Sequence, residues 1–327
     1  MSSTTRPTTS QMADNVSKQI RKKTLISRIN SRWESPVAGY LFIGPWLIGF
    51  LALTLYPMIQ SLYYSFTDFS LLNAPNWIGT RNYEKILTVD DKFLKSLKVT
   101  FLYVIGSVPL RLIAALLIAV LLNKNVRGIS FYRTAIYFPS LIGGSIAVSL
   151  LWKNMFSRDG FINDILHLFG VQGTGWTNNP DTALGTLVLL VVWQFGSAMV
   201  IFLGGLKQIP TDLYEASSVD GAKKISQFFR ITLPMLSPSI YFNLIMGFIG
   251  SFQMFTPALI ITNNGGPMSS TFVYALYLYE RAFGRMEMGY ASALAWIMLI
   301  IIVIVTSTIS LTSKYWVFYE SETGRKR

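Results

Sequence analysis

The chain has no cysteine, a single histidine and few charged residues: only 13% of its 327 residues are Asp, Glu, Lys or Arg. Without cysteine there is no disulfide framework and no thiolate metal site. Soluble domains carry about 25% charged residues, so an ordinary soluble enzyme is excluded as well. The abundant residues are apolar. Hydrophobic residues make up 51% of the chain and gather in runs near the ~20 residues that cross a bilayer. The composition predicts an integral membrane protein.

Motifs of ATP binding and of covalent catalysis are also missing. The sequence contains no GxxxxGK[ST] loop, no GxSxG elbow and no HExxH helix. We therefore expect no catalytic residue, no metal site and no cofactor in this chain. If ATP energy is used, another subunit must hydrolyse the ATP.

Long apolar stretches predict an all-α protein with six transmembrane helices. In lipid, backbone polar groups must be satisfied within the segment, which favours helices, and the alternating pattern of a β-barrel is absent. The expected spans are 37–58, 99–122, 135–152, 182–206, 235–261 and 288–312.

The basic residues predict the orientation of these spans. Of the 28 Lys and Arg residues, 18 fall in the segments 1–36, 123–134, 207–230 and 314–327, and seven fall in the alternating connections. The positive-inside bias then places both termini in the cytoplasm. The net charge of +12 thus indicates topology, and no nucleic-acid partner is expected. We predict a disordered basic arm at 1–36, a six-helix transmembrane domain at 37–313 and a cytoplasmic tail at 314–327.

The cytoplasmic connection 209–235 is the most informative segment. Its pattern predicts a short helix over 213–219, a sharp bend at Gly221, a second helix over 223–230, and Pro234 at the start of the fifth span. Two short helices on the cytoplasmic face suit docking into a groove of a partner. They equally suit an amphipathic hairpin that lies on lipid headgroups, and the residues alone do not separate the two.

This connection resembles a family signature. The segment reproduces the EAA-x3-G-x9-I-x-LP pattern of ABC-importer permeases, with a serine where the family often has alanine. Shorter stretches at 137–139, 151–153, 193–194, 262–267 and 289–293 are similar to the sugar-importer branch, which includes the first permeases of the maltose and glycerol-3-phosphate systems. The resemblance covers about residues 36–315. The positions that it implies couple to an ATPase are Tyr214, Glu215, Ala216, Ser217, Asp220, Gly221, Ile231, Leu233 and Pro234.

The resemblance implies a MetI-like permease core in a bacterial inner membrane. It further implies a second related permease, two ABC ATPase subunits that bind ATP and Mg, and an extracytoplasmic sugar-binding protein. The 209–235 loop would contain the coupling helix, with Glu215 as its anchor in the ATPase cleft or against the second short helix. The chain itself would move a sugar or oligosaccharide by alternating access.

A sugar path needs polar groups and aromatic faces within the spans. Candidates are Trp193, Gln194, Asn243, Phe252, Gln253 and Tyr290. For each of these residues helix packing is an alternative role. Arg111, near the middle of the second span, must face the bundle or a watery cavity because a charge is costly in lipid. It could contact an acidic sugar, or it could bond backbone carbonyls beside Pro109, and the sequence favours the second role.

The alternative function is a self-powered secondary transporter or channel for a polar solute. Such a protein would show ionisable residues along an ion path, or repeated broken helices. Arg111 is the only charged residue deep in a predicted span, which argues against this alternative.

Overall fold

The computed structural model describes residues 36–124 and 127–318. Within them the regular structure is helical, apart from two isolated β-bridges. The chain divides into two compact units, one that ends at Tyr63 and one that begins at Tyr64. Nearly all of the predicted 1–36 arm and the residues of the predicted tail beyond 318 lie outside the described residues.

The first unit is a continuous apolar helix with a bulge. Helix α2 (Pro36–Phe50) runs through the π-helical turn η1 (Leu51–Leu55) into α3 (Tyr56–Ser65). Residues 39–65 form a candidate span with a mean hydropathy of 1.7. Their side chains are largely exposed, and apolar side chains exposed in this number need an apolar surrounding, which a bilayer provides. The first predicted span is confirmed.

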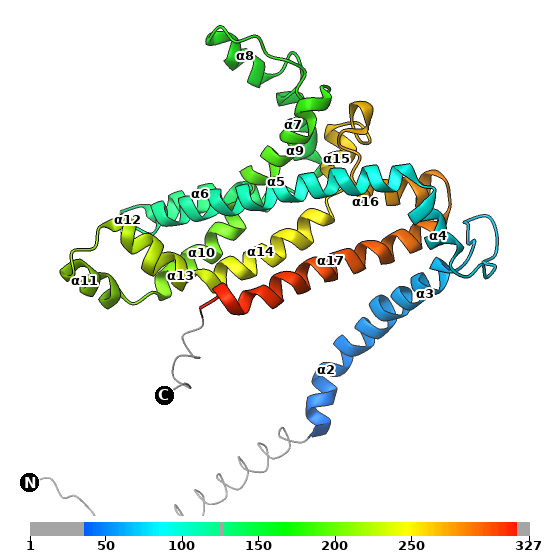
Figure 1. Ribbon diagram of the computed structural model, residues 1–327, viewed down its shortest axis with the longest axis horizontal. Coiled ribbons are helices and arrows are strands. Elements are labelled where there is room, and N and C mark those ends of the chain that lie inside the picture. Colours follow the sequence, from blue (N-terminus) through cyan, green and yellow to red (C-terminus); the bar gives the residue numbers. More distant parts are fainter. Residues whose placement is uncertain (1–35, 125–126, 319–327) are drawn as a thin grey trace, which may run out of the picture. The chain divides into compact units, whose positions relative to one another are not determined.

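The second unit contains the remaining helices, which Figure 1 shows in chain order. Before the connection 209–235 they are α4 (Arg81–Thr88), α5 (Asp91–Leu122), α6 (Ile129–Ile142), α7 (Ile146–Met155), α8 (Phe161–Leu168), α9 (Pro180–Trp193) and α10 (Gly196–Gln208). From the connection onward they are α11 (Thr211–Val219), α12 (Lys224–Gln227), η2 (Phe228–Thr232), α13 (Leu233–Met235), α14 (Ser237–Phe252), α15 (Thr256–Ile261), η3 (Pro267–Ser269), α16 (Tyr274–Tyr279), η4 (Glu280–Gly284) and α17 (Met288–Trp316).

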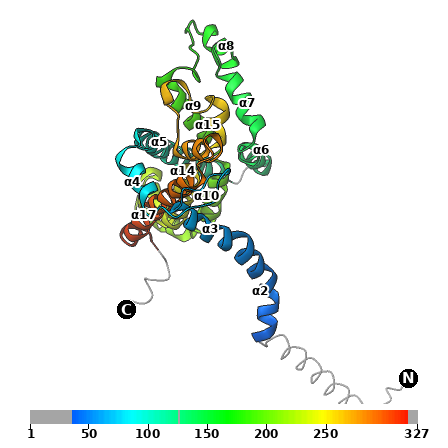
Figure 2. The same cartoon turned by 90° about the vertical axis from the view of Figure 1, so that its right-hand side faces the viewer.

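Helix α5 is the centre of this unit. It starts at the cap residue Asp90, whose carboxylate accepts from the backbone N–H groups of Lys92 and Phe93 at 3.1 and 3.3 Å, as a helix N-cap does. It packs against α9, α10, α14 and α16. In both views α7 and α8 project away from the layer of α5, α14 and α17 (Figures 1 and 2).

Three of the predicted spans are bent. The axes of α6 and α7 differ by 100°, those of α9 and α10 by 42°, and the helix entering α14 differs from α14 by 64°. Counting each bent pair as one span gives up to six candidate spans, as predicted, and the all-helical fold is confirmed. The breaks themselves were not expected, because apolar runs show length but not direction.

The fifth span is shorter than predicted. Helix α14 ends at Phe252, the chain leaves the helical path at Gln253, and α15 is a separate short helix. Pro257 is one cause, because it has no N–H to donate to the Gln253 carbonyl and its ring would clash with that carbonyl in a continuous helix. The expected single helix over 235–261 is therefore wrong at its C-terminal end, and a bend of 64° separates α13 from α14 near its predicted start.

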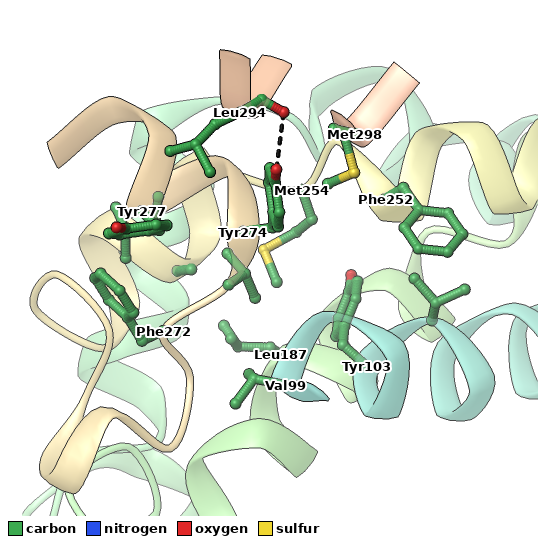
Figure 3. Close-up of a cluster of buried hydrophobic side chains, with 14 of the residues drawn as sticks. Val99, Tyr103, Leu187, Phe252, Met254, Phe272, Tyr274, Tyr277, Leu294 and Met298 are labelled. Atoms are coloured by element: carbon green, nitrogen blue, oxygen red, sulfur yellow. Dashed lines mark hydrogen bonds between the residues drawn. The ribbon is translucent and has the colours of Figure 1, made fainter. Parts of the chain in front are cut away.

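The core divides into two buried clusters along α5. Figure 3 shows the first, where Tyr274 and Tyr277 are fully buried and the Tyr274 hydroxyl donates to the Leu294 carbonyl at 2.8 Å. The second cluster joins α5 to α10 through buried side chains such as Ala119, Met199 and Phe202. Through these two clusters α5 packs against the neighbouring spans.

Candidate functional site

The predicted bend at Gly221 is confirmed by the backbone. Gly221 has φ +80°, in the left-handed region that glycine enters without steric cost. The N–H groups of Gly221 and Ala222 donate to the carbonyls of Ser218 and Ser217 at 3.0 and 2.9 Å, which closes the end of α11. Helices α11 and α12 thus form a hairpin, residues 211–227, which we call the coupling hairpin.

The two helices of the coupling hairpin are tied by Gln227. Its side-chain amide lies 3.0 Å from the Ser217 hydroxyl, 2.9 Å from the Ser218 hydroxyl and 3.3 Å from the Tyr214 carbonyl. Sequence reasoning missed this residue, because the spacing of the signature gives no signal for it. Ser217, the departure from the signature, is an acceptor in this clamp.

The hairpin is attached to the second core cluster by Tyr214. Its hydroxyl lies 2.9 Å from that of the buried Thr232, and Tyr214 and Ile231 both pack against this cluster. Leu233 and Pro234 follow directly in α13, which leads into α14. Tyr214 and α13 therefore connect α11 to the bent fifth span.

The remaining signature residues face outward. Glu215, Ala216 and Asp220 are exposed, and within the described residues no hydrogen bond or ion pair holds the Glu215 carboxylate. The expected contact between Glu215 and the second short helix is not formed, since Gln227 makes that connection instead. Apolar side chains are exposed around it, at Leu213, Val219, Ile225 and Phe229. The exposed surface of the hairpin thus offers the acids Asp212, Glu215 and Asp220 together with a set of apolar groups.

Two cavities lie beside Arg111, and we call them the Arg111 cavities. The larger, of about 270 Å³, is enclosed by α5, α10 and α14. It is lined by Val108, Arg111, Leu112, Ser197, Ala198, Ile201, Phe242, Asn243, Met246, Gly247 and Ser251. The smaller, of about 200 Å³, is lined by Tyr103, Arg111, Gly143, Gly144, Leu187, Leu190, Val191, Gln194, Gly250, Ser251, Met254 and Pro257.

The breaks of two bent spans meet at the smaller Arg111 cavity. Gln194, between α9 and α10, donates its amide to the Gly143 carbonyl, between α6 and α7, at 2.9 Å. The Ser140 hydroxyl donates to the Gln194 carbonyl at 3.1 Å. A Cβ on Gly143 would lie 2.1 Å from the Gln194 side chain, so glycine allows this approach. Broken helices supply polar groups at membrane depth in this way.

The predicted path residues are divided between several places. Arg111, Gln194 and Asn243 line the Arg111 cavities. Phe252 and Gln253 line a different, apolar cavity of about 390 Å³ beside Tyr274.

Two other predicted path residues lie elsewhere. Trp193 lies against Trp152, with ring centroids 5.7 Å apart. Tyr290 lines none of these cavities, and its hydroxyl donates to Asp90.

Asp90 and Tyr290 belong to an ionic cluster at the end of α5 opposite the coupling hairpin, and we call it the Asp90 cluster. The Asp90 carboxylate accepts from the Tyr277 and Tyr290 hydroxyls and from Arg281 at 3.0 Å. Arg281 also pairs with Glu287 at 2.8 Å. Burial alone would raise the pKa of Asp90, but the two tyrosine hydrogen bonds and the Arg281 charge outweigh it and lower that pKa. Sequence reasoning missed this cluster, because its members are far apart in the chain.

Comparison with known proteins decides the family. A family model described as "Binding-protein-dependent transport system inner membrane component" matches residues 88–317, which include α5, the coupling hairpin and α17. The chain belongs to this family of ABC transporter permeases. It is a multi-pass inner-membrane protein and the transmembrane, non-catalytic component of a binding-protein-dependent ABC transporter.

Similar permeases come from several bacteria. The probable ABC transporter permease protein YesP of Bacillus subtilis is 54% identical over 288 residues, which cover 88% of this chain and 93% of YesP. The probable starch degradation products transport system permease AmyD of Thermoanaerobacterium thermosulfurigenes is 35% identical, over 82% of this chain and 90% of AmyD. The lactose transport system permease LacF of Rhizobium radiobacter is 31% identical, over 83% and 92%.

A solved structure shares the permease fold. A chain of a bacterial ABC transporter involved in the import of the acidic polysaccharide alginate superposes with a TM-score of 0.74. The superposition covers 88% of this permease and 98% of that chain, at 20% identity. At this identity the likeness concerns the fold. The resemblance expected from the signature in 209–235 is confirmed.

Proposed function

We propose that this permease is one of two related transmembrane subunits of an ATP-driven importer for a sugar or oligosaccharide. Two ABC ATPases that bind ATP and Mg, and an extracytoplasmic sugar-binding protein, complete the complex. The family membership supports the importer, and relatives named for starch degradation products, lactose and arabinooligosaccharides support the substrate class. The positive-inside bias supports cytoplasmic termini.

The observation that carries this proposal is the exposed, internally tied coupling hairpin. An acid at Glu215 and apolar side chains at Leu213 and Val219 are free to enter a groove of an ATPase subunit. Because the Gln227 clamp holds α12 to α11, the hairpin would move as one body when the ATPases close on ATP. Tyr214 and the 231–235 segment would pass that movement to α14, which is alternating access driven from outside the membrane.

The substrate would pass through the bundle beside the broken helices. The Arg111 cavities combine amide, hydroxyl and guanidinium groups with apolar walls. Gln194 and Asn243 are the residues that we expect to meet sugar hydroxyls. Phe252 and Gln253 would border the path from the neighbouring cavity.

The presence of broken helices does not distinguish an ATP-driven importer from a self-powered transporter. The structure has three bent spans, a feature of secondary transporters too. The matching family decides in favour of the ATP-driven importer, and the second expected feature of a secondary transporter, a row of ionisable residues, is not found among the residues lining the Arg111 cavities.

The test is association and coupling in the assembled importer. The permease is purified from membranes together with its cognate ATPases, with Glu215→Ala as the variant and Glu84→Ala, an exposed acid of α4, as the control. We expect Glu215→Ala to lose the ATPase subunits or their stimulation by the loaded binding protein, and Glu84→Ala to keep both. Unchanged coupling in Glu215→Ala would show that the hairpin is not anchored by this acid, and absence of any ATPase partner would refute the importer.

A further inference from the structure

Arg111 stands apart from the other groups that line the Arg111 cavities. It lines both of them, as Ser251 does, and it carries the only charge among their lining residues. Its Nε atom is buried and has no hydrogen-bond partner in the described chain. Arginine stays protonated in proteins, so this site holds a positive charge that the described permease residues leave unbalanced.

A structural role would require hydrogen bonds that the guanidinium does not make. Pro109 removes a backbone bond within α5, yet within residues 36–124 and 127–318 no carbonyl accepts from Arg111. The Nε atom of Arg133 is likewise buried without a partner in the described chain, but its Nη2 atom donates to the Leu122 carbonyl at the end of α5, at 2.7 Å, which Arg111 does not match. One arginine is tied to the helix backbone, and the other is presented to a cavity.

From this contrast we infer that Arg111 binds a carboxylate of the cargo, and that the importer carries a sugar acid or an oligosaccharide containing one. The inference rests on the function proposed above and specifies its substrate. Guanidinium and carboxylate match as planar, bidentate partners, and a buried pair of this kind is strong.

The charge balance favours a carboxylate over a phosphate. A carboxylate brings one negative charge, which Arg111 balances, whereas a phosphate monoester brings about −1.5 to −2 and would stay partly uncompensated here. Amide and hydroxyl groups of Gln194, Asn243 and Ser251 lie on the same cavity walls, where they can meet the hydroxyls of the sugar ring. Arg111 would fix the acid, and these neutral groups would accept the rest of the sugar.

The experiment uses the whole importer in proteoliposomes, with its ATPases and its binding protein. The probes are matched disaccharides that differ only at C6, with glucuronic, galacturonic or mannuronic acid against glucose, galactose or mannose. Binding to the binding protein and ATP-dependent uptake are measured for the wild type, Arg111→Gln, Arg111→Lys and the control Arg133→Gln. Co-purification of the ATPases reports assembly of each variant.

We expect binding and uptake of at least one uronic acid probe. Removing one partner of a buried charge pair costs about 2 kcal/mol or more, and each 1.4 kcal/mol is tenfold. Arg111→Gln should therefore reduce uptake of that probe by about 30-fold or more, and it should assemble normally because the guanidinium makes no hydrogen bond to the described residues of the permease. Arg111→Lys should recover part of the uptake, and Arg133→Gln should keep the preference for the acid.

Three results would overturn the inference while leaving the importer intact. They are uptake of neutral probes alone, unchanged uptake of the acid by Arg111→Gln, and failure of Arg111→Gln to assemble, which would show a structural role. Failure of every probe, neutral and acidic, to bind or to enter would instead overturn the proposed sugar function, and the inference with it.

Discussion

The coupling hairpin and the Asp90 cluster lie at opposite ends of the second unit, and different contacts stabilise them (Figure 1). The hairpin is exposed and is tied by neutral hydrogen bonds from Gln227. The Asp90 cluster is centred on a buried ion pair, in which the side chains of Arg281 and Asp90 are 8% and 5% exposed. A buried pair loses much when one partner is removed, and an exposed neutral bond loses little. From this difference we predict that the Asp90 cluster is the fixed end of the permease and that the coupling hairpin is the movable end.

The largest effect is expected from Arg281→Leu. This change leaves the buried Asp90 carboxylate without its cation, and breaking a buried pair in this way costs about 3–5 kcal/mol. The midpoint of thermal unfolding of the purified permease measures the loss.

Arg285→Leu is the matched control, because Arg285 is 44% exposed and pairs with Glu280 at 3.4 Å. For such a surface pair a loss of about 0–1 kcal/mol is expected. Equal losses in the two variants would remove the distinction between a fixed and a movable end.

The Asp90 cluster also predicts a pH dependence. Because the pKa of Asp90 is lowered from 3.8 in the folded permease, its ionised form contributes stability that is present above this value. That contribution is lost as the pH falls below about 4 and the carboxylate takes up a proton. Thermal unfolding from pH 6 to pH 3 measures it, and Asp90→Asn should remove this part of the pH dependence. An identical pH profile in Asp90→Asn would contradict the assignment.

At the movable end, Gly221→Ala should have an intermediate effect. The left-handed conformation at φ +80° costs a residue with a Cβ roughly 1–2 kcal/mol. A Cβ at this position would meet no atom within 4 Å, so the backbone alone is strained. We expect a small loss of stability but a clear loss of coupling between ATP hydrolysis and transport.

Gly204→Ala is the control for that variant. Gly204 is an exposed residue inside α10, and a Cβ there also meets nothing within 4 Å. Alanine in a helix should stabilise by about 0.5–1 kcal/mol. Normal coupling in Gly221→Ala would show that the bend does not transmit the movement.

The contrast between the two ends also explains what could be predicted from the sequence. The hairpin was predicted because its determinants are local: a signature of fixed spacing and one glycine at the bend. The Asp90 cluster was missed because Arg281 and Asp90 are 191 positions apart, and nothing in either segment indicates the other. Tyr290 was expected in the sugar path because the sequence of α17 does not indicate that its hydroxyl binds Asp90.

The broken spans show the same limit. The third predicted span breaks at Gly143 and Gly144, and the 100° bend there was not expected. At the bend the Gly143 carbonyl accepts a hydrogen bond from Gln194 of another span. Hydropathy predicts that a segment is apolar enough to cross the membrane. It does not predict where the helix breaks, because the backbone groups freed at a break are bound by residues of another span, such as Gln194.

The smallest effect is expected from Gln227→Ala. The lost bonds to Ser217 and Ser218 are neutral and partly exposed, and a hydrogen bond of this kind contributes about 0.5–1.5 kcal/mol. A double-mutant cycle with Ser217→Ala, measured by thermal unfolding, isolates the contact, and Gln208→Ala, an exposed glutamine at the end of α10, is the control. If the hairpin acts as one body, Gln227→Ala should reduce coupling more than stability. If the stability losses of Gln227→Ala and Ser217→Ala simply add in the double mutant, the two side chains do not interact, and α12 is not held to α11 by this contact.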